Sequence, residues 1–185
     1  MDKLYIEKVL AGDLYAFKYF LEAYKDMAYS VAISIVKQEH LAEEIVQDAF
    51  LICYQSLKSF KGESKFSTWL YRIVVNCSFG ALRKVKNNIG EFDMEVHDVN
   101  FDESAFHILE KKEREHVVQE ALLKLPANEA LALRLFYLEE MSILEVREVT
   151  GWTETNIKTI LHRGRKHLYV VLSKLMKGDY YGIAR

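Results

Sequence analysis

KGESKFSTWLYRIVVNCSFGALRKVK, residues 61–86, predicts an amphipathic helix that follows a polar turn. The turn contains Gly62 and Ser64. Apolar residues then recur at helical spacing, namely Phe66, Trp69, Leu70, Ile73, Val74 and Cys77. No acidic residue occurs from Ser64 to Gly90, so the polar side of the helix carries positive charge only. This pattern fits a surface that meets a polyanion, but it also fits a core helix that carries lysines.

Two longer helices precede this stretch, after a short one at residues 3–11. Asp13 is a favourable N-cap for a helix that continues to about Lys37, and the next is expected at residues 41–59. The side chains expected to face the core are Phe17, Phe20, Leu21, Tyr24, Met27, Ala28, Val31 and Ile35 in the first, and Leu41, Ile45, Ala49, Ile52 and Cys53 in the second. Helices joined by short connections predict an all-α domain at residues 1–86.

An acidic cluster lies on the surface of the helix expected at residues 41–59. Glu44 and Asp48 are four residues apart, a spacing at which like charges disfavour an isolated helix. The cluster is either a solvated face or a docking face for a basic partner.

Charge along the chain divides it into three parts. Residues 1–86 hold 12 basic and 10 acidic residues, residues 87–111 hold 1 and 7, and residues 112–185 hold 12 and 10. The net charge of −2 therefore hides two mildly basic ends. Periodicity fades in residues 87–110, which we interpret as an acidic linker before a second domain at residues 111–185.

The second domain contains the pattern of a helix-turn-helix. Helices are expected at residues 105–125 and 127–138, separated by Pro126. Ser142 and Glu145 form the S-x-x-E capping box of another helix, and Gly151 is placed to end it. The helix expected from Glu154 to about Met176 is basic, as in many DNA-reading helices. A helical hairpin without a DNA role is the other reading.

Composition excludes several classes of protein. Hydrophobic residues make up 50% of the chain, enough for buried cores, yet the N-terminus lacks a signal-peptide pattern and no apolar run is long enough to span a bilayer. Cys53 and Cys77 lie in apolar helical patterns, which favours reduced, buried thiols. Because no nucleophile–base pair, phosphate loop or metal cluster is present, we expect neither an enzyme nor a cofactor, and a cytoplasmic protein without direct membrane insertion.

Three segments together resemble the sigma-70 family of RNA polymerase initiation factors, in its small extracytoplasmic-function (ECF) group. FKGESKFSTWLYRIVVN (60–76) is similar to the regions that melt and read the −10 promoter element, and LAEEIVQDAFLICYQSL (41–57) to the helix that docks on the polymerase clamp. LKLPANEALALRLFYLEEMSILEVREVTGWTETNIKTILHRGRKHL (123–168) is similar to region 4, which binds the −35 element. The resemblance implies an all-α protein with two small helical domains.

The resemblance also implies roles for individual residues. The loop at residues 62–65 would hold a flipped base, Asn76 would hydrogen-bond a −10 base, and basic residues would contact phosphates. Phe66 and Trp69 are candidates for base stacking, although Trp69 shares a face with Ile73 and is better explained as core. The residues implied to bind the −10 element are Gly62, Ser64, Lys65, Phe66, Arg72, Asn76, Arg83 and Lys84.

The implied −35 contacts are Lys158, Thr159, His162, Arg163 and Arg165, and the implied contacts with core polymerase are Glu44, Gln47 and Asp48. Three positions depart from the family pattern. Ile160 replaces a basic residue, Gly164 replaces alanine, and Arg147 replaces a small residue. The −35 preference is therefore the part least transferable from the family.

The resulting expectation is an ECF sigma factor. Its expected partners are core RNA polymerase, through the clamp helices and flap, promoter DNA and an anti-sigma factor. A stand-alone helix-turn-helix regulator is one alternative, although it leaves residues 61–86 unexplained. A sigma-like decoy that only binds protein is another, and the basic −10 face argues against it.

Overall fold

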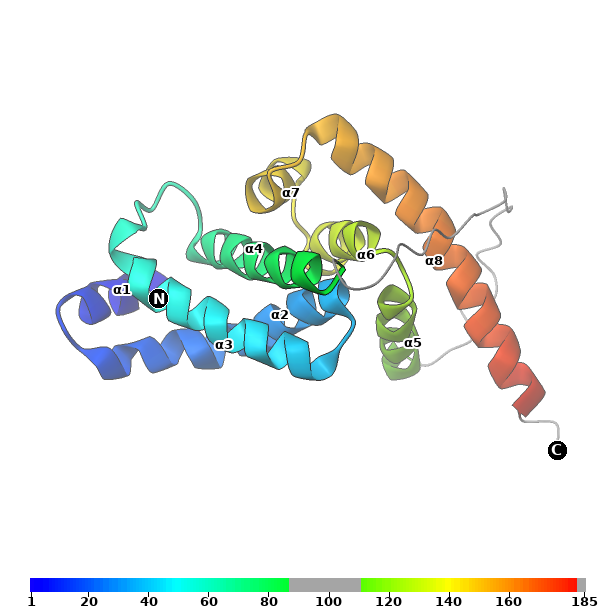
Figure 1. The fold of residues 1–185 in the computed structure, drawn as a ribbon, viewed down its shortest axis with the longest axis horizontal. Helices are drawn as coiled ribbons and strands as arrows, with labels where there is room; N and C mark the ends of the chain where they lie inside the picture. The colour runs from blue at the N-terminus through cyan, green and yellow to red at the C-terminus, as the bar shows by residue number, and fades with distance from the viewer. Residues whose placement is uncertain (87–110, 183–185) are drawn as a thin grey trace.

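The computed structural model describes residues 1–86 and 111–182, and the regular structure within these ranges is entirely helical (Figure 1). The first group of helices is α1 (Asp2–Leu10), the 3₁₀ turn η1 (Leu14–Phe17), α2 (Lys18–Val36), α3 (Glu39–Ser56), the 3₁₀ turn η2 (Leu57–Ser59) and α4 (Phe66–Lys86). The second group is α5 (Lys111–Leu123), α6 (Ala127–Leu133), the π-helical turn η4 (Arg134–Leu138), α7 (Ile143–Thr150) and α8 (Glu154–Gly182). The expected linker, residues 87–110, lies outside the described residues.

The helix ends follow the capping signals in the sequence. The Asp13 carboxylate accepts a hydrogen bond from the Ala16 backbone N–H at 3.3 Å. Ser142 and Glu145 form both bonds of the predicted capping box, and Gly151 ends α7 in the left-handed conformation at φ +73°. These local predictions are confirmed because each depends on residues at most four positions apart.

The core of the first group forms around Phe66, the first residue of α4. Its ring lies 4.4 Å from that of Phe20 on α2, and 5.8 and 5.7 Å from those of Phe60 and Trp69, measured between centroids. Phe66 is only 3% exposed. One buried ring thus fixes the start of α4 against α2 and against the loop that precedes it.

Two residues expected in this core are exposed instead. Ile52 is 42% exposed because the side of α3 that faces the core includes Phe50, which is 4% exposed, and not Ile52. Leu21 lies in the first turn of α2, at the end of the bundle, and is 40% exposed. Periodicity places both near a core face, but the orientation of that face depends on the neighbouring helices.

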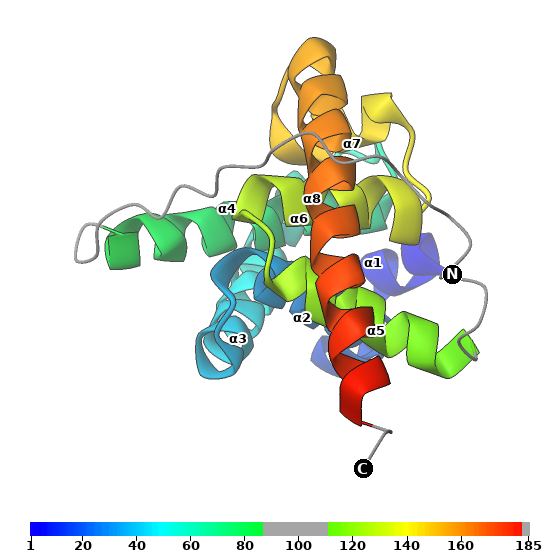
Figure 2. The same cartoon turned by 90° about the vertical axis from the view of Figure 1, so that its right-hand side faces the viewer.

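Close packing of α6 against α8 organises the second group, and Figure 2 shows α8 running past α6 and α5. Gly164 permits this approach, since a Cβ atom there would lie 3.2 Å from Leu133 Cδ1 and 3.3 Å from Glu129 Cβ. The close approach of α6 and α8 therefore explains why glycine occupies the position where the family usually has alanine. Glycine lowers helix propensity by about 0.5–1 kcal/mol, but it removes the contact that would push the two helices apart.

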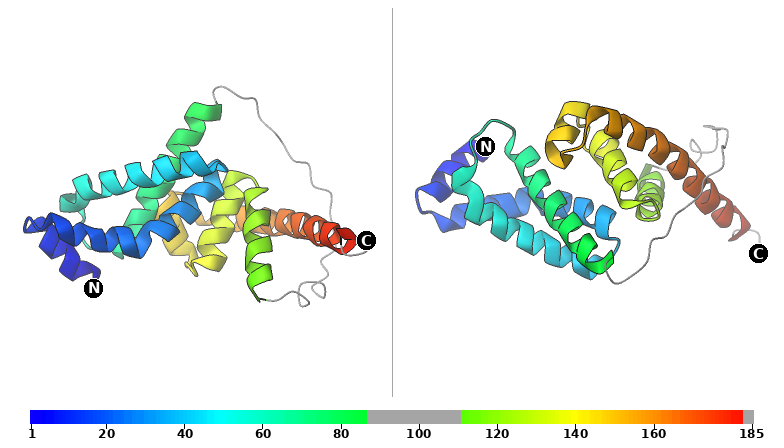
Figure 3. Two further views of the ribbon diagram at one scale, coloured as in Figure 1. Left: turned by 90° about the horizontal axis from the view of Figure 1, so that it is seen from below. Right: turned by 45° about the horizontal axis from the view of Figure 1, so that its top comes forward.

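The two groups of helices pack against each other. Helix α7 lies beside α4, while α2 contacts both α6 and α5 (Figure 3).

The capping box of α7 gives a stability prediction. Replacing Ser142 by alanine removes the acceptor for the Glu145 backbone N–H, which should lower the free energy of unfolding by about 1 kcal/mol. Ser142→Thr, which keeps the hydroxyl, should lie near wild type in urea denaturation. Equal stability of the alanine and threonine variants would show that the box contributes nothing.

Candidate nucleic-acid interface

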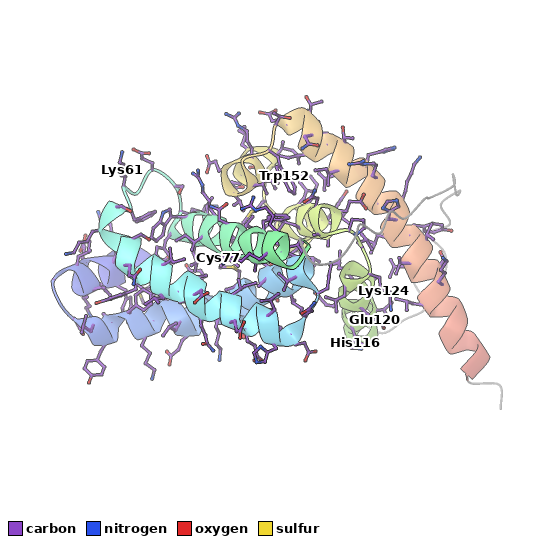
Figure 4. All side chains as sticks on the ribbon, in the orientation of Figure 1. Lys61, Cys77, His116, Glu120, Lys124 and Trp152 are labelled. Atoms are coloured by element: carbon purple, nitrogen blue, oxygen red, sulfur yellow. The ribbon has the colours of Figure 1, made fainter. Side chains whose placement is uncertain are left out.

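The loop before α4 is open to solvent. Gly62 adopts φ +72°, a conformation that residues with a Cβ rarely take, and Gly62 and Lys65 are both exposed. Ser64 is half-buried, and its hydroxyl is 3.4 Å from the Lys65 carbonyl oxygen. Figure 4 shows Lys61 at the outer edge of the molecule. This loop can therefore present backbone groups, a hydroxyl and two ammonium groups to a ligand.

One face of α4 continues this exposed surface. Arg72, Asn76, Arg83 and Lys84 are all exposed, and the first three follow one another at intervals of four and seven residues along one side of the helix. The arrangement places an amide among cations, as the sequence suggested. Phe66 differs: it is only 3% exposed and its ring packs against other aromatic rings in the core, which argues against the expectation that it stacks on a base.

A second exposed polar surface lies on α8. Lys158, Thr159, His162, Arg163 and Arg165 are all exposed there. Arg165 donates a hydrogen bond to the Tyr137 hydroxyl at 3.1 Å. Ile160 is 3% exposed and belongs to the core, so the apolar residue at this position faces α8's neighbours rather than solvent.

The turn between α7 and α8 sets the position of this surface. The Thr153 hydroxyl accepts a hydrogen bond from the Asn156 backbone N–H at 3.2 Å and so caps α8. Arg147 of α7 pairs with Glu154 of α8 at 3.5 Å. The departure at Arg147 thus adds an ion pair across the turn, between two partly exposed side chains, where the energetic gain is small.

The acidic cluster of α3 lies on the solvent side of the first group. Glu44, Gln47 and Asp48 are exposed, and Glu44 lies 3.4 Å from the His40 ring nitrogen. Two apolar side chains extend the same part of the helix: Leu51, which sequence reasoning did not assign, is 55% exposed, and Ile52, which it expected in the core, is 42% exposed. An exposed face with carboxylates at one end and apolar groups at the other suits a partner helix that is both basic and apolar.

The contact between α4 and α7 is polar and includes one candidate DNA residue. Lys65 Nζ lies 3.1 Å from Glu145 Oε1, and the Tyr71 hydroxyl donates to Glu139. Hydrogen bonds from the Ser142 backbone N–H and hydroxyl, together with Lys65, hold the pKa of Glu145 below its usual value. A cavity of about 340 Å³ remains between the two groups, lined by Tyr24, Thr68, Glu140 and these residues.

At the turn, the Phe79 and Trp152 rings meet edge to face with centroids 6.4 Å apart. Figure 4 shows Trp152 between α7 and the far end of α4. The helix-turn-helix is thus held against α4 at both ends of α7.

Two more cations, the half-buried Lys37 and the buried Arg134, lie where the two groups of helices meet. Lys37 Nζ donates to the Leu122 carbonyl oxygen at 2.8 Å, and burial, together with the charge of Arg134, lowers the pKa of Lys37 to about 7. Arg134 is 4% exposed, donates to Gln119, and lies 4.0 Å from Glu139, while its Nε has no partner. Sequence reasoning missed both residues, although Arg134 is the single charge in the apolar run ALALRLF.

Within the described residues, no group of three or more His, Cys, Asp or Glu side chains is arranged to hold a metal ion. Nor does any described helix combine the length and apolar character needed to cross a membrane.

Two family models match separate parts of the chain. The family model of sigma-70 region 2 matches residues 20–87, and that of sigma-70 region 4 matches residues 115–168. The chain is 33% identical to ECF RNA polymerase sigma factor SigW of Bacillus subtilis, over 91% of this chain and 95% of the relative. It is 29% identical to ECF RNA polymerase sigma factor SigM of the same organism, over 83% and 93%.

Solved structures share the fold. The sigma factor RpoE from Bartonella quintana, in complex with the anti-sigma factor NepR, gives a TM-score of 0.64 at 23% identity and covers 85% of this chain and 96% of the solved one. CnrH, in complex with the cytosolic domain of CnrY, gives 0.56 at 20% identity, with 96% and 98% covered.

The lowered pKa of the Lys37 amine predicts that the contact between the two groups is sensitive to pH. We call the state in which the two groups of helices pack together the closed arrangement. A lysine in water has a pKa of 10.5, so between about pH 7 and 10.5 the closed arrangement binds fewer protons than a state in which the two groups are separated. The closed arrangement should therefore become more favourable as the pH rises from 7. Small-angle scattering should report a smaller radius of gyration at pH 9 than at pH 7, and Lys37→Met should show less change. A wild-type radius that grows over this range would contradict the assignment.

Proposed function

The chain belongs to the ECF group of the sigma-70 family, and from that premise we propose that it selects promoters through the two exposed polar surfaces of α4 and α8. As a sigma factor it acts in transcription initiation. One chain carries both an exposed polar face on α4, next to the open loop, and a capped helix-turn-helix with a basic second helix. This combination is the observation that supports our assignment best. We assign residues 1–86 to region 2 and residues 111–185 to region 4, joined by the acidic segment at residues 87–110.

The α4 surface captures the non-template strand at the −10 element. Asn76 is the base reader, because its amide offers both a donor and an acceptor. Arg72, Arg83 and Lys84 hold phosphates, and these contacts set position without reading sequence. The loop at residues 62–65 receives a flipped base, and its contacts offset the cost of unstacking that base.

The α8 surface enters the major groove at the −35 element. Lys158, Thr159, His162 and Arg163 read base edges there, while Arg165 contacts the backbone. Because Ile160 is buried, base reading depends on these polar residues alone.

The exposed face of α3 docks on core polymerase through Glu44, Gln47 and Asp48. A basic clamp surface would relieve the repulsion between the two carboxylates. Region 4 would contact the flap. The chain performs no chemistry and takes no cofactor: it positions polymerase and holds the melted strand, and it works in the cytoplasm with the polymerase.

Promoter binding requires the closed arrangement to open. The −35 and −10 elements lie about 25 base pairs apart, which is roughly 85 Å along a duplex at 3.4 Å per base pair. Lys65 of the −10 surface and Glu145 of the helix-turn-helix are 3.1 Å apart in the structure. An extended chain of 24 residues reaches at most about 85 Å, so the connection is long enough for the required separation.

An anti-sigma factor fits this scheme as a partner that keeps the sigma factor from polymerase and DNA. One of the solved structures described above, that of RpoE with NepR, is a complex of a sigma factor with an anti-sigma factor. A stand-alone helix-turn-helix regulator is not favoured, because region 2 is present as well as region 4.

Asn76 provides a test of base reading. Holoenzyme with Asn76→Ala should transcribe less from a wild-type promoter, by about fivefold to a hundredfold, and should show a changed base preference at one −10 position. Selection from a library with a randomised −10 element measures both effects. The same preference in wild type and variant would remove Asn76 from the reading set.

Asp48 provides a test of docking. Asp48→Lys should weaken the affinity for core polymerase but leave binding to naked DNA unchanged, since the α3 surface does not touch DNA in this scheme. Asp26→Lys, at another exposed acidic position of the first domain, is the matched control for the change in net charge. Undiminished assembly of the Asp48→Lys holoenzyme would refute the docking face.

A further inference from the structure

A second cavity lies between the loop before α4 and the N-terminal helix α1. Its volume is about 520 Å³, within the range of ligand-binding pockets. One wall is formed by Phe60, Lys61, Gly62 and Ser64, which precede α4, together with Phe66 at its start. The other is formed by Asp2, Lys3, Ile6 and Glu7 of α1. The family model of region 2 begins at residue 20, so it assigns no role to α1.

Helix α1 is fixed in place by contacts with α2. The Asp2 carboxylate accepts hydrogen bonds from the Tyr19 and Tyr24 hydroxyls, at 2.8 and 2.7 Å. The Tyr5 ring stacks on that of Tyr19, with centroids 4.0 Å apart and planes 4° from parallel. Because these contacts hold the helix, the face that α1 turns toward the cavity is fixed too.

The bottom of the cavity is apolar and aromatic. Phe66 is buried, and Phe60 and Ile6 are half-buried. The Phe60 ring is held edge to face against Phe66 and tilted against Trp69. A half-buried ring that its neighbours hold in place is suited to stack on a nucleobase, a contact worth about 1–3 kcal/mol.

The rim of the cavity is charged. Lys3 and Glu7 are exposed and lie one helical turn apart, and Lys61 is exposed on the opposite wall. Neither Lys3 nor Glu7 has an ion-pair partner within the part of the chain that the structure describes. A free carboxylate accepts hydrogen bonds from the exocyclic amino group of a base, and ammonium groups contact phosphates.

We propose that α1 forms the second wall of the pocket for the flipped base, and that Glu7 accepts a hydrogen bond from the base's exocyclic amino group. Adenine, cytosine and guanine carry such a group and thymine does not, so the pocket disfavours thymine. Lys3 and Lys61 hold the phosphates on either side, and Phe60 supplies the stacking surface. This inference rests on the proposed function, because it requires that the loop receive a base.

The test uses reconstituted holoenzyme and a promoter library randomised over the −10 element. Glu7→Gln keeps the size of the side chain but adds a donor and removes the charge. It should reduce the discrimination against thymine at one position by about tenfold, while core binding stays at the wild-type level. Glu22→Gln, at an exposed carboxylate of α2 away from the cavity, should select the same sequences as wild type.

Four outcomes separate the claims. A changed preference in Glu7→Gln alone supports the inference. If wild-type holoenzyme selects a −10 sequence and Glu7→Gln selects the same one, α1 does not read the base and only this inference fails. If wild-type holoenzyme selects no promoter, the proposed function fails as well. Should Glu7→Gln instead lose affinity for a protein partner and keep its base preference, the cavity is a peptide site and the inference is overturned.

Discussion

The packing of α7 against α4 is the contact on which the arrangement of the whole chain depends. Helix α4 presents Arg72 and Asn76 to solvent on one side, and on the other it carries Tyr71, which donates a hydrogen bond to Glu139. The helix that we propose as a reading surface therefore also serves as the platform for the helix-turn-helix. Both uses are compatible in the free chain, but they are not compatible on a promoter whose two elements lie about 85 Å apart.

The chemistry of this contact is consistent with a reversible association. Much of it is polar, with a cavity of about 340 Å³ left between the helix groups. Lys37 and Arg134 are cations in a setting that disfavours their charge, and the Arg134 Nε lacks a partner. Buried charges of this kind contribute little net stability, because desolvation offsets much of the attraction. Separation returns both cations to water, so the cost of breaking the interdomain bonds is partly offset.

Sequence reasoning succeeded where a structure is determined locally. Asp13, Ser142 and Gly151 mark helix ends through bonds that span only a few residues, and each was identified from its pattern. It failed where a side chain's environment depends on distant segments. Ile52 is exposed because of how α3 is oriented against its neighbours. The tie between Lys37 and Leu122 joins residues 85 positions apart, and no local pattern indicates it. The assignment of DNA-binding residues came from family resemblance, and the structure adds which of these residues are exposed and which, like Phe66, are not.

We infer that one chain carries two promoter-reading surfaces that are held together when it is free and separated on DNA. The separation can be measured by pulsed electron–electron double resonance between spin labels at positions 22 and 148. Both positions are exposed and lie outside the assigned surfaces. The half-buried Cys77 would first be replaced by serine so that labelling is specific. We predict a short, narrow distance distribution for the free chain and an increase of tens of ångströms in promoter-bound holoenzyme. The same distance in both states would contradict the account.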